Sequence, residues 1–300
     1  MKVSVIITTF NRANLLRRAI ESVLAQEYKD FELIVLDNNS KDDTENIVKK
    51  FNDSRILYVK HKPLGISEAR NLGVRRARGE YVGFLDDDDK WLPSKLSLQT
   101  TLFDRSSPKL GLVYGGFLRM SSDGAVYEIF KPTLRGNVLR EYLCQRNPLT
   151  GSASNPLIRR SVFSVVGGYD EGIKTSEDWE FYLRLARKYE FDFVSQPVVK
   201  IRQHKGPRLG DRIKDALDTE LLVYKNFQDI IESDKACKSF YLQAIGGKYC
   251  RISQLAIGRR YIREAIHSHP LNFKAYWQYI FSFFGSSFYQ RMHKFYKFFR

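Results

Sequence analysis

The sequence predicts an α/β fold in which a mostly parallel sheet is flanked by helices and followed by a C-terminal helical extension. Four short apolar segments recur about every 25 residues in the first third of the chain, with helical patterns between them. The segments are continuously apolar rather than alternating, which is typical of parallel strands covered on both faces. We expect these strands at residues 3–9, 31–36, 56–59 and 81–85.

The connecting segments have the periodicity of helices. Residues 15–24 carry one apolar stripe, Ser40 resembles a helix N-cap, and another helix is expected to begin near Ser67. The chain is less regular beyond residue 110, where we expect strands at 111–120 and 191–201 around a helix at 177–189. From about residue 211 onward the pattern is helical.

Composition indicates a soluble globular protein, with 43% hydrophobic and 28% charged residues. The three cysteines, Cys144, Cys237 and Cys250, are widely spaced and match neither a disulfide framework nor a zinc site, so a reducing cytoplasm is expected. The first ten residues lack the features of a secretory signal. No segment reaches the roughly 18 to 20 apolar residues that are needed to span a bilayer.

The net charge of +15 is unevenly distributed. Residues 201–300 hold 18 Lys and Arg against 8 Asp and Glu, and from Lys235 onward there are 12 basic residues and one acid, Glu264. The last part of the chain should therefore attract an anionic surface, either nucleic acid or lipid headgroups.

Polar residues follow three of the predicted strands: residues 8–12, 37–40 and 86–89. Parallel strands place their carboxyl ends at one edge of a sheet, and ligands of such sheets bind in the crevice beyond that edge. We therefore expect these three segments to line one binding site.

Four consecutive aspartates, Asp86 to Asp89, form the third of these segments. Carboxylates this close repel one another unless solvent or a cation screens them. Oxygen ligands suit Mg²⁺ or Mn²⁺, which bind one or two carboxylates together with substrate phosphates. A solvated acidic turn is the alternative that the run by itself leaves open.

The surrounding residues extend this pattern into a family resemblance. The segment 79–93, GEYVGFLDDDDKWLP, resembles the Asp-x-Asp block of family 2 glycosyltransferases, which have the GT-A fold with its Rossmann-like sheet. Residues 3–12, 32–42 and 69–73 are similar to further motifs of that family in the same order, as are 167–171 and 176–180. The likeness is dense over about the first 95 residues and extends to about residue 205.

The resemblance implies roles for individual residues. It places the nucleobase and ribose of a nucleotide sugar near Thr8, Phe10, Arg12 and Asp37, and its diphosphate near Arg70. Asp86 and Asp87 would contact ribose and metal-linked phosphate. Asp88 would be the principal metal ligand, with Asp86 and His204 as further candidates. The family has a small residue between its first two aspartates, so the acidic residue at that position here leaves the choice of metal-binding carboxylate open.

Glu177 and Asp178 begin a predicted amphipathic helix, where the helix dipole favours ionised carboxylates. An ionised carboxylate can act as a general base if it reaches the acceptor hydroxyl. In the family the second acid of this pair usually has that role, which implies Asp178 as the base and Glu177 as the alternative. The implied reaction is a displacement with inversion at the anomeric carbon.

The resemblance also implies a division of the chain: a GT-A catalytic domain at 1–205, with a nucleotide-binding half at 1–110 and an acceptor-binding half at 111–205, and a helical, basic and aromatic region at 206–300. The expected partners are a nucleotide diphosphate sugar, Mn²⁺ or Mg²⁺, and a glycan or lipid-linked acceptor. The C-terminal aromatic and basic residues would hold the enzyme on the inner face of the cytoplasmic membrane. The alternative that the sequence leaves open is that these aromatic residues pack onto the catalytic domain or a partner subunit.

The sequence disfavours three other functions. A noncatalytic nucleic-acid-binding protein would explain the basic charge, but the four aspartates would repel phosphate in the absence of metal. A sugar-phosphate nucleotidyltransferase or a dinucleotide-binding oxidoreductase needs a glycine-rich loop after the first strand, and residues 9–15 contain no glycine. No nucleic-acid partner is expected.

Overall fold

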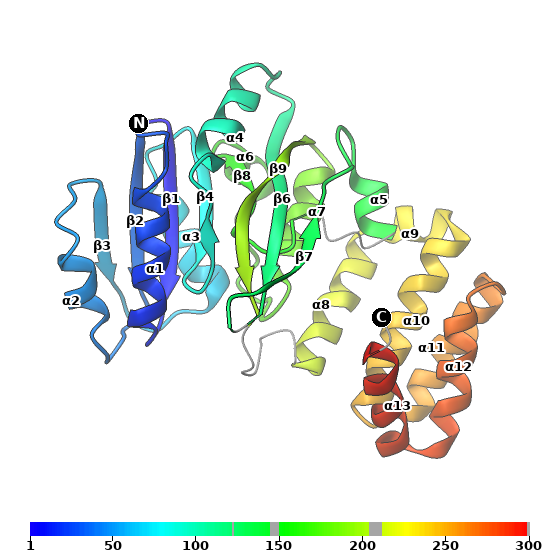
Figure 1. Cartoon of the computed structure of the whole chain (residues 1–300). Coiled ribbons are helices and arrows are strands. Elements are labelled where there is room, and N and C mark those ends of the chain that lie inside the picture. Colours follow the sequence, from blue (N-terminus) through cyan, green and yellow to red (C-terminus); the bar gives the residue numbers. More distant parts are fainter. Residues whose placement is uncertain (122, 145–149, 204–211, 299–300) are drawn as a thin grey trace. The chain divides into compact units, whose positions relative to one another are not determined.

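A computed structural model of the chain describes residues 1–121, 123–144, 150–203 and 212–298. Its backbone forms two compact units. The first, the sheet unit, comprises residues 1–139, 148–172 and 177–206, and the second, the helical unit, comprises residues 140–147, 173–176 and 207–300. The sheet unit contains one sheet of nine strands, in the order β3-β2-β1-β4-β8-β6-β9-β5, with β7 paired to β6 (Figure 1).

The first four strands are parallel, as predicted, and their bounds are β1 (Val3–Thr9), β2 (Phe31–Asp37), β3 (Ile56–Lys60) and β4 (Tyr81–Asp86). In the register of these strands, Thr9 is level with Asp37 and Thr8 is level with Asp86. The polar ends of β1, β2 and β4 therefore meet at one edge of the sheet, as the sequence predicted.

Beyond β4 the sheet is mixed rather than parallel. The strands are β5 (Lys90–Trp91), β6 (Leu110–Met120), β7 (Val126–Phe130), β8 (Leu157–Arg159) and β9 (Glu190–Arg202). Strand β8 is antiparallel to both β4 and β6, whereas β9 is parallel to β6. A strand of three residues such as β8 is too short to leave a periodic pattern, and periodicity does not specify strand direction, so the sequence did not predict this change.

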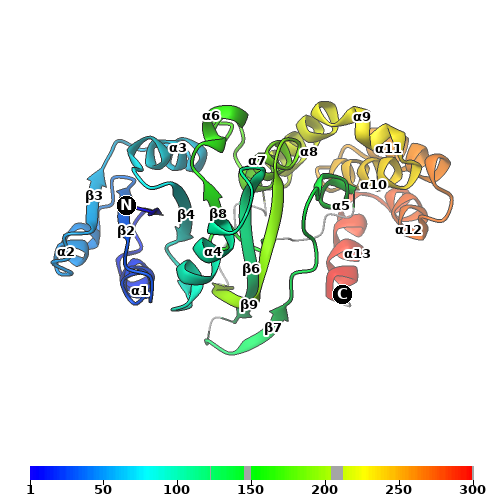
Figure 2. The same cartoon turned by 90° about the horizontal axis from the view of Figure 1, so that it is seen from above.

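Helices cover both faces of the sheet (Figure 2). On one face lie α1 (Ala13–Leu24), α2 (Thr44–Lys49) and α4 (Lys95–Asp104), which share a buried apolar core with the strands. On the other lie α3 (Ile66–Arg76), α6 (Val162–Val166) and α7 (Glu177–Ala186). Helix α3 packs so closely that a Cβ at Gly73 would lie 2.6 Å from Cγ2 of Ile6, which explains the glycine there.

The helical unit consists of α5 (Leu139–Cys144), α8 (Ile213–Asn226), α9 (Gln228–Ser233), α10 (Lys235–Arg251), α11 (Leu255–Ser268), α12 (Phe273–Phe281), the 3₁₀ turn η2 (Ser282–Phe284) and α13 (Ser286–Phe298). Its core contains Leu242, Ile262, Ala265, Ala275 and Tyr289. None of the helices within the described residues is both long and apolar enough to cross a bilayer.

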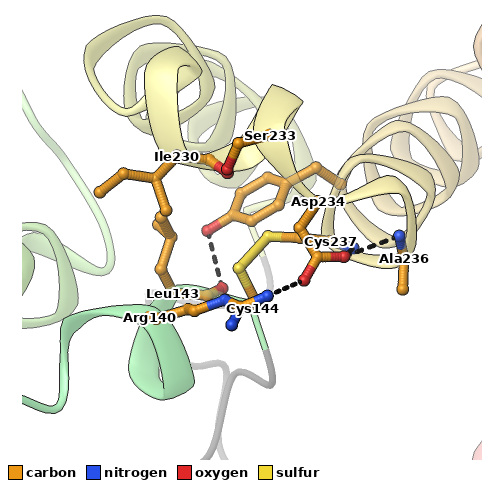
Figure 3. Close-up of a disulfide and its surroundings, with 9 residues drawn as sticks. Arg140, Leu143, Cys144, Ile230, Ser233, Asp234, Ala236 and Cys237 are labelled. Carbon is orange, nitrogen blue, oxygen red and sulfur yellow. Dashed lines mark hydrogen bonds and ion pairs between the residues drawn. A yellow bond between two sulfur atoms is a disulfide. The ribbon is translucent and has the colours of Figure 1, made fainter.

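The expectation of unpaired cysteines was wrong for two of the three. Cys144 at the end of α5 and Cys237 in the first turn of α10 form a disulfide, beside an ion pair between Arg140 and Asp234 (Figure 3). Cys250 is free and buried. The 93-residue separation of the pair gives no local sequence signal, because only the packing of α5 against α10 brings the two side chains together.

Candidate active site

The loop after β1 carries three of the predicted donor-binding residues. Thr8 is the penultimate residue of β1, and the side chain of Phe10 is exposed at the carboxyl edge of the sheet. Asn11 has a φ of 52°, a left-handed conformation that Asn tolerates, and it turns the chain into Arg12 immediately before α1. This turn brings the Arg12 guanidinium to the acidic residues after β4.

Asp37, at the end of β2, is fully buried, and both of its carboxylate oxygens accept hydrogen bonds. Oδ1 accepts from the backbone N–H of Ser40 at 2.8 Å, and Oδ2 accepts from the Tyr58 hydroxyl at 2.5 Å. Burial, together with this carboxylate, raises the pKa of Tyr58. Ser40 is not the predicted N-cap, since α2 begins only at Thr44; its hydroxyl instead accepts from the N–H of Asn11 at 2.9 Å. Asp37 and Ser40 thus hold the loops after β1 and β2 together.

The four carboxylates of the acidic run have different partners, and Asp87 is bound by the loop after β1. Its Oδ2 accepts from the Thr9 hydroxyl at 2.8 Å, and its Oδ1 accepts from Nη1 of Arg12 at 3.0 Å. Burial raises the pKa of Asp87 to about 6, an effect that the Arg12 charge and the Thr9 hydrogen bond oppose. Both oxygens of Asp87 are therefore occupied by protein donors.

Asp89 is also buried, but it faces a different part of the sheet unit. Its Oδ2 accepts from the hydroxyls of Ser152 at 3.0 Å and Ser154 at 2.6 Å, and its Oδ1 accepts from the N–H of Arg202 at 2.9 Å. Burial, with the nearby charges of Asp86 and Asp88, raises its pKa well above the ordinary value. Asp89 therefore joins the acidic run to the segment before β8 and to the end of β9.

Asp86 and Asp88 are the two members of the run with the more exposed side chains. The side chain of Asp86 is 36% exposed and that of Asp88 13%, compared with 6% for Asp87. Asp86 accepts from Nη2 of Arg70 at 3.2 Å, and Asp88 lies 3.4 Å from Nη1 of Arg12. These two carboxylates are the ones that a ligand at the edge of the sheet can reach most readily.

Arg70, on α3, is buried at the centre of the site. Its Nη1 donates to Oε1 of Glu177 at 2.5 Å while its Nη2 donates to Asp86, and its guanidinium carbon lies 5.4 Å from the ring centre of Tyr169. The neighbouring carboxylates outweigh the effect of burial and raise the pKa of Arg70 further, so it remains charged. Arg70 thus connects the acidic run at the end of β4 with the acid pair at the start of α7.

Glu177 and Asp178 begin α7, as predicted; Glu177 is buried and Asp178 is half-buried. Oδ1 of Asp178 accepts from the N–H of Trp179 at 2.8 Å. Burial, aided by the charge of Glu177, raises the pKa of Asp178 to about 6, although Arg70 acts in the opposite direction. The position of Asp178 at the start of the helix, from which the sequence predicted an ionised carboxylate, therefore coincides with a raised pKa.

The acidic residues fit a divalent cation that is shared with a ligand. No group of three His, Cys, Asp or Glu side chains in the described part of the chain is arranged to hold a metal by itself. Mg²⁺ and Mn²⁺ commonly take one or two carboxylates and complete their coordination with phosphates and water, which matches the accessible pair Asp86 and Asp88. The third predicted ligand, His204, lies outside the described residues.

Sequence reasoning missed the residues that support these carboxylates. Ser152 and Ser154 lie in a small polar segment that reads as an ordinary loop, and nothing in its sequence indicates a contact with residues some 65 positions earlier. Thr9 lies within the predicted polar segment 8–12, but its direct contact with Asp87 was not predicted. The side chain of Asn71, within the motif at 69–73, donates to the carbonyl of Tyr169 at 2.9 Å and so fixes α3 against the segment before α7.

Comparison with known proteins agrees with this architecture. The model of the Glycosyl transferase family 2 matches residues 4–167. An uncharacterized glycosyltransferase of Rickettsia typhi is 32% identical over 224 residues, which are 73% of this chain and 70% of the relative. An uncharacterized glycosyltransferase of Rickettsia felis is 31% identical over 208 residues. This match covers 67% of the present chain but only 34% of the longer relative. The Escherichia coli UDP-Glc:alpha-D-GlcNAc-diphosphoundecaprenol beta-1,3-glucosyltransferase WfaP is 42% identical over 98 residues, which are 32% of this chain and 39% of that protein.

Solved structures that bind nucleotide sugars share this fold. Residues 1–349 of S. aureus TarS in complex with UDP-GlcNAc superpose with a TM-score of 0.68 at 17% identity, covering 89% of this chain and 81% of that TarS chain. The mannosyltransferase PcManGT of Pyrobaculum calidifontis, in complex with GDP-Man and Mn²⁺, superposes with a TM-score of 0.61 at 18% identity, covering 89% and 75%. The predicted GT-A fold is confirmed, and the chain belongs to glycosyltransferase family 2.

Proposed function

We propose that the chain transfers a sugar from a nucleotide diphosphate donor to an acceptor hydroxyl, with inversion at the anomeric carbon. The observation that carries this proposal is the position of Arg70, whose two terminal nitrogens contact Asp86 of the acidic run and Glu177 of the acid pair. One guanidinium thus joins the place where a donor diphosphate would bind to the place where an acceptor would lose its proton.

Asp178 is the proposed general base. A base must be ionised before it can accept a proton, and a carboxyl with a pKa of about 6 is ionised at neutral pH while remaining more basic than an ordinary aspartate. Glu177, held by Arg70, is the alternative. Each acid has one oxygen in a hydrogen bond, but the partner of Glu177 is the charged Arg70 guanidinium at 2.5 Å whereas that of Asp178 is the backbone N–H of Trp179, which favours Asp178.

The proposed donor site is the carboxyl edge of β1, β2 and β4. The exposed ring of Phe10 offers a surface against which a nucleobase can stack, next to Thr8 and Asp37. Asp86 and Asp88 would hold a Mn²⁺ or Mg²⁺ ion, which when bound neutralises negative charge on the donor diphosphate. Arg12 and Asp87 support this edge from the protein side through their mutual ion pair.

The proposed reaction is a single displacement. The acceptor oxygen forms a bond to the anomeric carbon from the face opposite the diphosphate, and the bond from that carbon to the diphosphate oxygen breaks with its electron pair. The acceptor proton passes to Asp178. Arg70 donates hydrogen bonds within this site, and its fixed positive charge favours the charge that develops on the departing diphosphate.

A lipid-linked acceptor is proposed because the related WfaP is named for an undecaprenol-linked acceptor. The helical unit supports membrane binding, since several large apolar side chains of α12, η2 and α13 are exposed: Phe273, Trp277, Ile280, Phe283, Phe284 and Phe288. Not all of the aromatic residues in this region contribute. Tyr289 is buried in the helical core and Tyr279 and Phe281 pack against it. An interfacial position on the inner face of the cytoplasmic membrane would use the exposed set together with the local excess of basic residues.

The proposed organisation follows from these assignments. Residues 1–110 would bind the nucleotide, residues 111–205 would contribute the base and bind the acceptor, and residues 206–300 would contact the membrane. The base helix α7 falls within the second of these segments.

The test is an assay of nucleoside diphosphate release with a panel of UDP and GDP sugars and water-soluble glycan acceptors, with Mn²⁺ or with EDTA. We expect metal-dependent release with one donor that increases on addition of acceptor, and its loss in Asp88→Ala. Release of pyrophosphate from a nucleoside triphosphate and a sugar phosphate would favour nucleotidyl transfer instead. Binding to RNA or DNA without any nucleotide-sugar binding would favour the nucleic-acid-binding alternative.

A further inference from the structure

The segment at residues 150–155, before β8, is held rigidly against the sheet. The side-chain amide of Asn155 donates to the carbonyls of Gly115 at 2.8 Å and Thr150 at 2.9 Å, and its oxygen accepts from the N–H of Gly115 at 2.9 Å. The indole N–H of Trp91 donates to the carbonyl of Ser154 at 2.7 Å. These contacts fix the places from which the hydroxyls of Ser152 and Ser154 reach the acidic run.

The two hydroxyls connect Asp89 with Asp86. Ser152 lies 3.0 Å from Oδ2 of Asp89 and 3.2 Å from Oδ2 of Asp86. Ser154 lies 2.6 Å from Oδ2 of Asp89, and its oxygen accepts from the backbone N–H of Asp86 at 3.0 Å. A serine hydroxyl has a single proton, so a hydroxyl that donates to Asp89 turns its lone pairs toward other donors. Asp89 therefore orients Ser154 to accept from Asp86.

Asp89 itself is buried at the edge of the sheet. The residue is only 3% exposed. Its Oδ2 is bound by the serines, and its Oδ1 accepts from the N–H of Arg202 at the end of β9. Both carboxylate oxygens of Asp89 therefore accept hydrogen bonds from protein groups that are far from Asp89 in sequence. The more accessible Asp86, by contrast, shares its contacts with the same serines.

We propose that Asp89 is a positioning residue: it orients Ser154, which holds the backbone N–H of Asp86, and it shares the proton of Ser152 with the Asp86 carboxylate, so that this carboxylate is directed toward the donor and its cation. It does not contact either of them. This inference rests on the proposed function, since it concerns the same site, and it assigns the fourth aspartate of the run a role different from those of Asp86 and Asp88.

A second buried carboxylate provides a matched control. Glu32 is 1% exposed, accepts from the Ser4 hydroxyl at 2.6 Å and from the N–H of Arg78 at 2.8 Å, and lies near the start of β2, at the opposite edge of the sheet. Like Asp89 it accepts from a serine hydroxyl and a backbone N–H, and it differs in also pairing with the Arg78 guanidinium at 2.7 Å. Loss of either carboxylate should cost stability, but only Asp89 should affect the donor site.

The experiment measures the Mn²⁺ concentration that gives half-maximal binding of UDP, and of GDP in parallel, by calorimetry in the wild-type protein, Asp89→Asn and Glu32→Gln. An asparagine side chain has one acceptor oxygen in place of two, so the hydroxyls of Ser152 and Ser154 are oriented less firmly. We expect this concentration to rise about tenfold or more in Asp89→Asn, as for other residues that orient metal ligands, and to stay unchanged in Glu32→Gln. Both variants should have lower melting temperatures.

Combining substitutions provides an independent check that does not depend on Asp89→Asn alone. If the serines act through Asp89, Ser154→Ala should also raise the half-saturating Mn²⁺ concentration, and the double variant should be no worse than the more severe single variant. Wild-type metal affinity in both single variants, or fully additive effects, would overturn the assignment. So would a complete loss of metal-dependent binding in Asp89→Asn at every Mn²⁺ concentration, which would make Asp89 a direct ligand. If the wild-type protein itself bound no nucleotide, the proposed function would fail first, and the assignment with it.

Discussion

The sheet unit and the helical unit differ in what their surfaces offer. In the sheet unit the polar groups converge: Arg70 and Arg12 each contact two carboxylates, and Asp37, Asp87 and Asp89 are buried with their oxygens occupied. In the helical unit, by contrast, many of the large side chains of α12, η2 and α13 are exposed, among them Phe273, Trp277 and Phe284. The sequence from residue 235 onward carries a single acid.

From this contrast we expect the sheet unit to carry out the reaction and the helical unit to determine where the enzyme binds. Buried, mutually fixed charges are expensive to assemble and occur where a site must be preorganised. Exposed aromatic side chains beside positive charge suit a surface that is itself apolar and anionic. We therefore expect substitutions in the sheet unit to change catalysis, and those on the exposed face of the helical unit to change only where the enzyme binds.

The largest effect is expected for Asp178→Asn, which keeps the shape of the side chain but removes its ability to accept a proton. The rate of transfer should fall by about 10² to 10⁴ while donor affinity is retained. Glu180→Gln is the matched control, because Glu180 is buried on the same helix but pairs with Arg184. An active Asp178→Asn together with an inactive Glu177→Gln would exchange the roles of the two acids.

Removal of the disulfide should destabilise the helical unit without affecting the donor site. Cross-links that close loops of this length stabilise proteins by about 2 to 5 kcal/mol, so Cys144→Ser should lower the melting temperature of the helical unit clearly in calorimetry. Cys250→Ser, which changes an unpaired cysteine of α10, should have a much smaller effect. A Cys144→Ser protein that melts like the wild type would show that the bond contributes nothing to stability in solution.

Membrane binding is expected to depend on the helical unit and not on the sheet unit. Serine at Phe273, Trp277 and Phe284 removes exposed apolar surface that would insert into the bilayer, and should weaken binding to phosphatidylglycerol vesicles by about thirtyfold or more in a flotation assay. Transfer to a water-soluble acceptor should not change. The control replaces Val126, Tyr127 and Ile129, which are exposed on β7 of the sheet unit. If only the control lost flotation, the membrane contact would lie on the sheet unit, which would contradict the prediction.

The smallest predicted effect concerns pH. Because Asp178 must be ionised to act and burial raises its pKa to about 6, kcat/KM should increase with pH through that value and level off above it. At pH 5 the activity should be about tenfold below its plateau, since each unit below the pKa reduces the ionised fraction tenfold. A profile that is flat from pH 5 to pH 8 would remove Asp178 from the proton transfer.

Local patterns predicted a good part of this molecule. The four parallel strands and the helix that begins at Glu177 are continuous apolar or amphipathic segments, and their polar ends follow from the topology. The antiparallel β8, the disulfide and the serines that hold Asp89 could not be predicted, because each depends on contacts between residues far apart in sequence. The raised pKa of Asp178 likewise arises from burial, which the residues of α7 alone do not determine.

The central claim is that the accessible carboxylates of the acidic run bind a nucleotide together with a divalent cation. Titration of UDP and GDP into the wild-type protein and Asp88→Ala, each with Mn²⁺ and with EDTA, tests it most directly. We expect the wild-type protein to bind one of the nucleotides only when Mn²⁺ is present, and Asp88→Ala to bind neither while keeping its melting temperature. Equal affinity with Mn²⁺ and with EDTA, or an Asp88→Ala protein that binds as the wild type does, would contradict the account.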